Sequence, residues 1–347
     1  MRFDKSIGIR SIAQAAGVSA STVSRVLRNK GEISPQTRER IERIAGELGY
    51  RPNLAVRTMQ TGRSGIVGVL LDITDDPLFR GRVLAGIHNA LIPADYLPII
   101  VWPRHDDARY HDAAQVHRLV DQRVDGIIMC SDDLSESFYT YIDHLSIPVV
   151  LVDRAVEAVH RDAVVTDNAL GARLAADHLL GLGHRHICYM SEAGGLTEDG
   201  GRGEPFISRV NDHGEARCTV VRISRVHGGY EESLCLLREI DRPTAVFAFN
   251  DYIAYHVYRA AQECRLRVPE DLSIFGFGNL PSIVGIFPSL TTFEQTPERV
   301  GRIASERILQ RISGELSDPP ETILLEPTMV HRRSTGPAPE PLASRVR

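Results

Sequence analysis

From residue 65 onward, short apolar runs rich in β-branched residues alternate with amphipathic segments of helical length. The apolar runs cover residues 66–71, 98–101, 126–129, 149–152, 163–165, 187–190, 219–223, 244–249 and 272–277. Continuous apolar strands that helices separate predict parallel sheets covered on both faces. Because a strongly twisted open sheet rarely exceeds about ten strands, we expect two doubly wound subdomains, with a ligand cleft outside the carboxyl ends of their strands.

The chain before residue 50 has no strand-like run and carries the pattern of two short helices joined by a turn. Gly17 stands where the first helix ends, and glycine tolerates the left-handed conformation that such an exit needs. Ser19 is placed to cap the second helix. The residues expected to face inward are Ile12, Ala13, Ala16, Val23, Val26 and Leu27. The pattern therefore predicts an α-helical helix-turn-helix.

The second of these helices has an outer face suited to DNA. Its residues are Ala20, Ser21, Thr22, Ser24, Arg25 and Arg28. Small polar side chains and arginines fit a major groove, and no carboxylate is present to repel phosphate. A third helix, capped by Ser34, started by Pro35 and ended by Gly49, is expected to close the core. Its inward residues are Ile41, Ile44, Ala45 and Leu48.

Positive charge is concentrated at the start of the chain. Residues 1–63 contain 12 Lys and Arg against 5 Asp and Glu, a net +7, and the rest contains 28 against 40, a net −12, which together give the −5 of the whole chain. A basic head on an acidic body indicates that only the head meets a polyanion. A solvated basic surface is the alternative interpretation.

Several protein classes lack support in the sequence. The five cysteines are scattered without a C-x-x-C motif, and no histidines cluster at metal-ligand spacing, so we expect reduced thiols, no metal and no cofactor. The N-terminus has no apolar run typical of a signal peptide, and no segment is long enough to span a bilayer. We therefore expect a soluble, cytoplasmic protein. Neither a G-x-S-x-G motif nor a P-loop is present, which argues against an enzyme.

Residues 9–60 closely resemble the head of the lactose-repressor (LacI/GalR) family. The family pattern I-x-x-[IV]-A-x-x-A-G-V-S-x-x-T-V-S-R-V-L matches residues 9–27, and Leu48-Gly49-Tyr50-Arg51-Pro52-Asn53 matches the segment that follows. The resemblance implies a transcriptional regulator, with a repressor favoured, that binds a palindromic operator as a homodimer. A small helical bundle that does not bind DNA is the alternative.

The same resemblance assigns DNA-contacting residues. Base edges in the major groove are expected to meet Ala20, Ser21 and Arg25, with Arg25 reading a guanine. Phosphates are expected to meet Ser19, Thr22, Ser24, Asn29 and Tyr50. The helix-turn-helix domain would span residues 7–51, and residues 52–64 resemble the family's hinge helix.

The hinge segment would enter the minor groove through Asn53, Arg57 and Met59. The family usually has leucine at the wedge position and alanine before the arginine, whereas this chain has Met59 and Val56. Methionine is apolar and long enough to wedge between bases. The alternative is that Met59 only covers the surface of the body.

The resemblance continues to about Ser334 and implies a periplasmic-binding-protein fold used as a sensor. Its markers are residues 123–128, 148–153, 165–168, 182–187, 242–251, 267–273 and 290–292. It implies three crossings between subdomains, near 164–167, 290–293 and 316–322. The effector-sensing, dimerising body is thus residues 65–334, with an N-subdomain of 65–164 and 292–316 and a C-subdomain of 165–291 and 317–334. The Pro-rich tail 335–347 is expected to be disordered.

The family's effector positions correspond here to Leu78, Phe79, Asp153, Asp167, Arg202 and Asn250. An arginine beside Asn and Asp at strand ends suits the hydroxyls of a sugar or related metabolite, or a small anion. The alternative is that strand-end Asp and Asn residues only cap helices or turns.

One position departs from the family. Where the family has Gly-[FY]-Asp-[DN], with the Asp gripping the ligand, this chain has Gly276-Phe-Gly-Asn279, so Gly278 replaces the carboxylate. A regulator controlled by a protein partner, or independent of any ligand, therefore stays a competing hypothesis. A solute-binding receptor is disfavoured by the DNA-binding head. The sequence identifies neither the effector, the operator, the regulated genes nor the direction of regulation.

Overall fold

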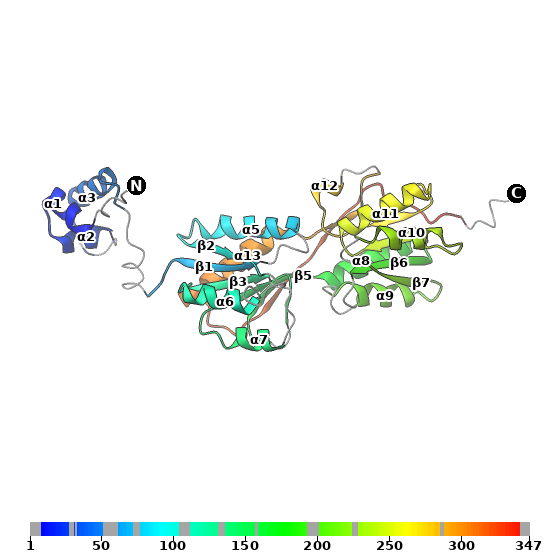
Figure 1. Ribbon diagram of the computed structural model, residues 1–347, viewed down its shortest axis with the longest axis horizontal. Coiled ribbons are helices and arrows are strands. Elements are labelled where there is room, and N and C mark those ends of the chain that lie inside the picture. Colours follow the sequence, from blue (N-terminus) through cyan, green and yellow to red (C-terminus); the bar gives the residue numbers. More distant parts are fainter. Residues whose placement is uncertain are drawn as a thin grey trace. The chain divides into compact units, whose positions relative to one another are not determined.

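The computed structural model describes residues 8–27, 31, 33–50, 62–71, 77–103, 112–130, 136–156, 159–192, 201–223, 228–284 and 288–340 (Figure 1). The chain forms two compact units, Met1–Ser64 and Gly65–Arg347. Among the described residues, none of the helices has the length and apolar character needed to cross a membrane.

The first unit contains the helices α1 (Ile9–Ala16), α2 (Ala20–Leu27) and α3 (Pro35–Glu47). The predicted caps are confirmed, because the Ser19 and Ser34 hydroxyl oxygens accept hydrogen bonds from the backbone amides of Thr22 and Thr37 at 3.1 and 3.3 Å. The predicted inward residues are also confirmed, and the buried ones are Ile12, Ala13, Ala16, Val23, Val26, Ile41, Ile44 and Ala45. Leu27 and Leu48 pack against this core while partly exposed.

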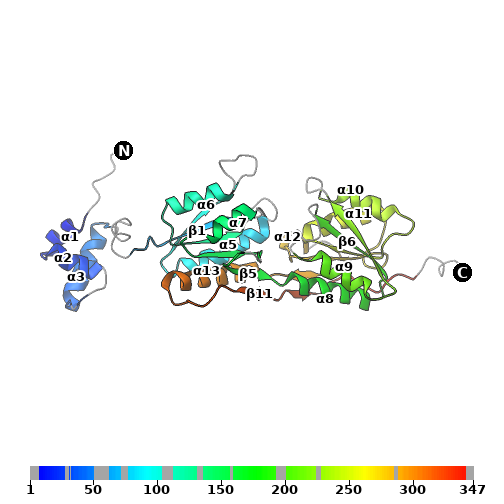
Figure 2. The ribbon, with the colours of Figure 1, turned by 90° about the horizontal axis from the view of Figure 1, so that it is seen from below.

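In the second unit, six parallel strands among the described residues form a sheet in the order β11-β5-β4-β3-β1-β2. Figure 2 labels β1, β5 and β11 of this sheet. The strands are β1 (Ile66–Leu71), β2 (Leu97–Val101), β3 (Gly126–Cys130), β4 (Val149–Val152), β5 (Asp162–Thr166) and β11 (Thr322–Leu325). One face is covered by α5 (Pro77–Leu91) and α13 (Pro297–Ser313), and the other by α6 (Asp112–Asp121) and α7 (Glu136–Asp143). Burial on both faces explains why the strands are apolar throughout.

The helices α5 and α13 touch each other more closely than ordinary side chains permit. A Cβ atom added to Gly86 would lie 2.1 Å from the carbonyl oxygen of Glu298, and one added to Gly301 would lie 2.1 Å from that of Val83. No residue with a side chain fits either place. These two glycines therefore fix how α13 returns to the first sheet.

A second parallel sheet, in the order β7-β6-β8-β9 within the described part of the chain, forms the other subdomain. Its strands are β6 (His186–Glu192), β7 (Arg217–Ile223), β8 (Ala245–Ala248) and β9 (Ser273–Phe275). The helices α8 (Asn168–Gly181) and α9 (Gly203–Asn211) cover one face, and α10 (Tyr230–Arg238) and α11 (Asp251–Glu263) cover the other. A short helix α12 (Pro281–Val284) follows. The predicted fold class, an all-α head and two parallel-sheet α/β subdomains, is thus confirmed.

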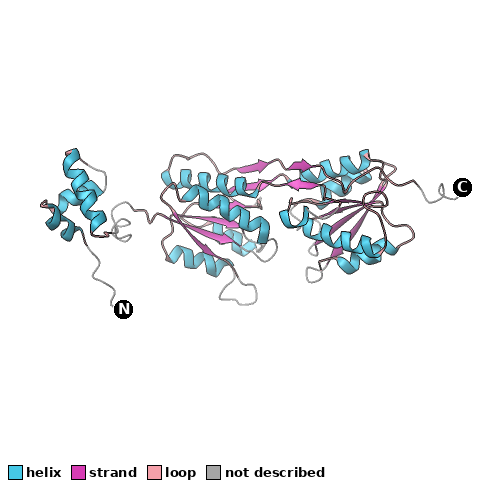
Figure 3. Cartoon of the chain, turned by 90° about the horizontal axis from the view of Figure 1, so that it is seen from above, coloured by secondary structure: helices cyan, strands magenta, loops and turns pink. Residues whose placement is uncertain are grey.

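The segments that join the two sheets run side by side, as Figure 3 shows. They include the antiparallel pair β10 (Thr292–Glu294) and β12 (Thr328–Val330). The second crossing follows Glu294, slightly later than expected, because the backbone of Gly278 still donates to the carbonyl of Phe293 at 2.8 Å. Residues 292–294 therefore adjoin the C-subdomain.

The predicted position of the third crossing, near residues 316–322, is wrong. Residues 317–334 were assigned to the C-subdomain, but Thr322–Leu325 pair in parallel with Asp162–Thr166 at the edge of the first sheet. The chain therefore crosses after Leu325. Asp162 holds this edge, because its buried carboxylate accepts hydrogen bonds from Arg307, Arg311 and the amide of Glu321.

The expectation of a disordered tail from residue 335 is also wrong for its first residues. The Gly336 amide donates to Ser273 Oγ at 3.0 Å, and the Ala338 amide donates to the carbonyl of Leu182 at 2.9 Å. His184, fully buried, lies against the Gly336 carbonyl at 3.1 Å. Burial lowers the pKa of His184 to about 4, so its ring is neutral and donates to that carbonyl through Nε2. Residues 341–347 lie outside the described residues.

Candidate DNA-reading helix and effector residues

Helix α2 presents its predicted base-reading residues to solvent. Ala20, Ser21 and Arg25 are exposed, whereas Val23 and Val26 on the opposite side are buried in the core of the first unit. Helix α2 contains no acidic residue, and Arg25 makes no ion pair with any residue that the structure describes. An unpaired guanidinium on an exposed helix is available for bidentate contact with guanine.

The predicted phosphate-contacting hydroxyls gather at the start of α2. Ser19 Oγ lies 2.7 Å from Ser21 Oγ and 2.8 Å from Thr22 Oγ1, so these hydroxyls form one cluster at a helix N-terminus. Backbone amides and the helix dipole make such a terminus attractive to phosphate. Thr22 and Ser24 are half-buried.

Tyr50 differs from the others, because its half-buried ring packs against the core of the first unit. Its amide donates to the carbonyl of Ala45 at 2.9 Å. Asn29, Asn53, Arg57 and Met59 lie outside the described residues, so their DNA contacts stay predictions.

Among the described residues of the first unit, the acidic side chains lie on α3, and two of them pair with arginines of the same helix. Glu47 pairs with Arg43 at 2.7 Å, and Glu42 lies 4.0 Å from Arg38. The Arg38 guanidinium also donates to the carbonyl of Val26 at 3.5 Å. The net positive charge of the head is therefore not offset on α2.

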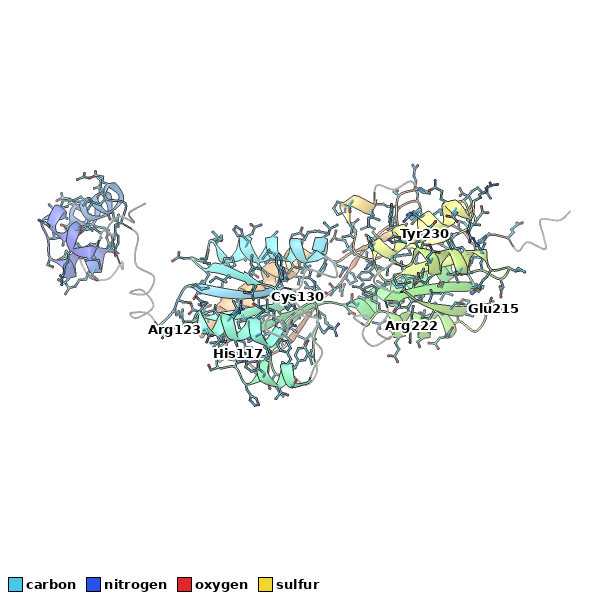
Figure 4. All side chains as sticks on the ribbon, viewed as in Figure 1. His117, Arg123, Cys130, Glu215, Arg222 and Tyr230 are labelled. Atoms are coloured by element: carbon cyan, nitrogen blue, oxygen red, sulfur yellow. The ribbon has the colours of Figure 1, made fainter. Side chains whose placement is uncertain are left out.

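In the second unit, the predicted effector residues follow the carboxyl ends of strands. Figure 4 labels Cys130, the last residue of β3, and Arg222, near the end of β7, which mark these ends in the two sheets. Asp153 and Asp167 directly follow the neighbouring strands β4 and β5. Because parallel strands end at the same edge, these two carboxylates belong to one side of the sheet.

The two aspartates differ in what they do. Asp167 Oδ1 caps α8 by accepting from the amide of Leu170 at 2.8 Å, and Asn250 Oδ1 likewise caps α11 from the amide of Ile253 at 2.9 Å. Asp153 has a positive φ of 70° and its half-buried carboxylate has no partner among the described residues. A strained residue with an unused carboxylate is typical of a binding site. Helix capping thus explains the presence of Asp167 and Asn250, each of which accepts through Oδ1. It does not explain the carboxylate of Asp153.

Arg202 lies at the centre of a buried cluster. Its guanidinium carbon lies 4.5 Å from the ring centre of Phe249 and 4.0 Å from that of Phe277. It donates to Asn168 Oδ1 at 3.0 Å and to the carbonyl of Phe249 at 2.7 Å, with Gln295 Oε1 at 3.5 Å. Sequence reasoning missed these partners, although Asn168 directly follows the predicted Asp167. The cluster joins α9 to the ends of β8 and β9 and to the crossing segment.

The two residues predicted for the first cleft loop are separated by the structure. Leu78 is 47% exposed, whereas Phe79 is buried among the residues that α5 and α13 pack on the sheet. Phe79 thus packs in the core of the N-subdomain, and its contact with an effector stays a prediction. Leu78 stays available for a contact.

Gly278, which replaces the family's aspartate, has a φ of 135°. The nearby Asp251, missed by sequence reasoning, is fully buried, and its carboxylate accepts from the amide of Leu280 at 2.7 Å and from Thr292 Oγ1 at 2.5 Å. Its signal in the sequence was the same as that of Asn250, a polar residue at a strand end. Asp251 holds the protein's own loop, so it does not substitute for the missing ligand-binding carboxylate. No group of three or more His, Cys, Asp or Glu side chains in the described ranges could hold a metal ion.

Comparisons with known proteins agree with this geometry. Residues 8–53 match the family described as bacterial regulatory proteins, lacI family, and residues 176–335 match a periplasmic binding protein-like domain. The chain is 30% identical over 336 residues to the HTH-type transcriptional repressor PurR of Erwinia tasmaniensis, covering 95% of this chain and 97% of that protein. It is 32% identical over 333 residues to the ribose operon repressor of Haemophilus influenzae, covering 94% and 98%.

A solved structure with a similar fold is the lac repressor dimer bound to operator and the anti-inducer ONPF. The TM-score is 0.84 at 24% identity, covering 96% of this chain and 100% of that one. The likeness extends over both units of the chain.

The backbone conformation of Gly278 predicts that the aspartate usual in the family would be unfavourable at this position. An added Cβ would meet Asp251 and Leu280 only at ordinary distances, 3.7 Å, so the φ of 135° alone opposes a side chain. We expect Gly278→Ala and Gly278→Asp to lower the free energy of unfolding by about 1–3 kcal/mol in urea denaturation. Gly81→Ala, in the interior of α5 with open space around it, is the matched control and should be neutral or stabilising. Wild-type stability of Gly278→Asp would contradict this account.

Proposed function

The chain belongs to the lacI family of bacterial regulatory proteins, and from that premise we propose that it is a cytoplasmic transcriptional repressor. In this proposal it binds a palindromic operator as a homodimer, and a small molecule held between the two subdomains of the body changes its affinity for the operator. The relatives are named as repressors rather than enzymes, which favours regulation over catalysis.

The observation that carries the proposal is the outer face of α2. Ala20, Ser21 and Arg25 are exposed on a helix without acidic residues, and the hydroxyls of Ser19, Ser21 and Thr22 gather at its N-terminus. Arginine supplies base recognition, and a helix N-terminus supplies phosphate contact. The net +7 of residues 1–63 adds the sequence-independent attraction to DNA.

Exposed apolar side chains on the body support the homodimer. Leu97, Ile100 and Trp102 on and beside the edge strand β2 are 55%, 44% and 53% exposed. Tyr252 and Tyr255 on α11 are 54% and 38% exposed. Edge strands with large apolar side chains are typical of surfaces that a partner covers, and a two-fold operator requires two copies of α2.

The unused carboxylate of Asp153, the exposed Leu78 and the polar cluster around Arg202 support a small-molecule effector such as a sugar or related metabolite. Gly278, which replaces the family's ligand-binding aspartate, favours a second candidate: a regulator controlled by a protein partner or independent of any ligand. Operator binding screened against sugars, nucleosides and sugar phosphates distinguishes the two, since the second candidate predicts no response to any compound.

The DNA-binding proposal predicts the effect of removing Arg25. With fluorescently labelled duplex DNA from the region upstream of its own gene, Arg25→Ala should weaken binding about tenfold to a hundredfold in an anisotropy titration, because a bidentate guanine contact is lost. Arg43→Ala on α3, where Arg43 already pairs with Glu47, is the control and should bind within about threefold of wild type. Equal losses of affinity in both variants would mean that Arg25 contributes only non-specific electrostatic attraction, and would contradict base reading by Arg25.

The homodimer proposal predicts that a charge on the edge strand separates the subunits. Ile100→Glu should shift sedimentation from dimer to monomer and expose Trp102, the single tryptophan of the chain, to acrylamide quenching. Ile240→Glu is the control, because Ile240 is also apolar and fully exposed but lies outside this surface. A dimer that survives Ile100→Glu and leaves Trp102 accessible would place the interface elsewhere.

A further inference from the structure

Glu294 is the last residue of β10 and stands where the chain leaves the C-subdomain for α13. Its side chain is 18% exposed, so its carboxylate is largely removed from water. A carboxylate in such a position requires hydrogen-bonding or charged partners to remain ionised. Its two oxygens have partners on different subdomains.

Oxygen Oε1 faces the N-subdomain. It accepts from Arg82 Nη2 of α5 at 3.2 Å and from the amide of Thr296 at 2.8 Å. The same guanidinium binds Glu298 of α13 through Nε at 2.7 Å and Nη2 at 2.9 Å. These hydrogen bonds from Arg82 hold the pKa of Glu298 below its ordinary value. Arg82 thus joins α5 to both ends of the crossing segment.

Oxygen Oε2 faces the C-subdomain. It accepts from Asn279 Nδ2 at 2.8 Å, and Asn279 belongs to the loop that follows β9. Arg332 holds the other side of that amide, donating through Nη2 to Asn279 Oδ1 at 2.7 Å and through Nη1 to the carbonyl of Leu290 at 2.8 Å. Asn279 has a φ of 52°, so these bonds hold a loop in an uncommon conformation.

We propose that Glu294 couples the two subdomains, by joining Arg82 of the N-subdomain to the Asn279 loop of the C-subdomain. A rotation that separates Arg82 from Asn279 breaks either the charge-assisted bond from Arg82 or the bond from Asn279 to a largely buried carboxylate, which is costly. The bridge therefore favours the arrangement in which both bonds form. An effector that moves the subdomains acts against it.

The bridge through Glu294 is relevant to effector control because of where the Asn279 loop lies. Asn279 directly follows Gly278, the residue that replaces the family's ligand-binding aspartate. The loop is thus held by the protein's own Glu294, Arg332 and Asp251. The coupling is a property of the free protein. Its role in effector control rests on the proposed function.

Hydrogen exchange of the full-length protein, without DNA or effector, tests the coupling. The readout is exchange at the amides of Asn279 and Leu280, which donate to Thr292 Oγ1 and Asp251 Oδ2. We expect about tenfold faster exchange at these amides in Glu294→Gln, because a charged acceptor is lost. Arg82→Gln should also speed exchange at this loop, although Arg82 makes no hydrogen bond to Asn279 and acts only through Glu294.

Glu298→Gln is the matched control, because it removes the other acidic partner of Arg82 but leaves the bond from Glu294 to Asn279 in place. It should leave exchange at the loop unchanged. If Glu294→Gln speeds exchange but Arg82→Gln does not, Glu294 has only a local role and the coupling is refuted. If neither variant alters exchange, the bridge carries no measurable energy and the proposal is also refuted.

Operator binding by the same variants separates this proposal from the proposed function. Faster exchange in Glu294→Gln and Arg82→Gln, in a protein that binds no specific DNA, supports the coupling while the repressor proposal fails. Unchanged exchange in a protein that binds its operator gives the opposite result.

Discussion

The close contact of α5 with α13 is the constraint on which the arrangement of the body depends. Gly86 and Gly301 leave no room for a Cβ, so the two backbones meet directly. Because α13 comes after the whole second sheet in the chain, this contact returns the chain to the first sheet and fixes where the crossing segment ends. Arg82, Glu294 and Glu298 are brought together by it. The contact thus fixes the N-subdomain end of one of the segments that join the two subdomains.

Local features of the fold were predictable from the sequence, and long-range ones were not. The caps at Ser19 and Ser34 and the apolar spacing of the first unit depend on residues a few positions apart, and they are as predicted. The pairing of β11 was missed because it is a short edge strand with Leu324 57% exposed, so nothing local distinguishes it from a loop. Residues 335–338 were expected to be disordered from their Pro-rich composition. That expectation failed because the partners that order them, near Leu182, His184 and Ser273, are distant in sequence.

The candidate site follows the same division. The family resemblance identified Asp153, Asp167 and Asn250, but the sequence did not decide that Asp167 and Asn250 cap helices while the Asp153 carboxylate has no partner among the described residues. Phe79 was assigned to the cleft by resemblance, yet Phe79, Val83, Ile87 and Leu91 recur every fourth residue and are all buried, so helical periodicity could have predicted its place in the core. The partners of Arg202 and Glu294 come from segments far apart in the chain, and no local pattern indicates them. The structure of the head thus depends on local sequence, whereas the surroundings of the candidate effector residues depend on contacts that only the fold brings together.

The central claim, that α2 reads a two-fold operator, is tested most directly by selection from a random library of duplex DNA with the purified full-length protein, because this needs no knowledge of the operator. Sequencing of the retained DNA should give an inverted repeat with two half-sites related by two-fold symmetry, and binding to it should weaken steeply as salt rises. A pool that stays random after repeated rounds at moderate salt, or that converges on a single asymmetric site, would contradict the account.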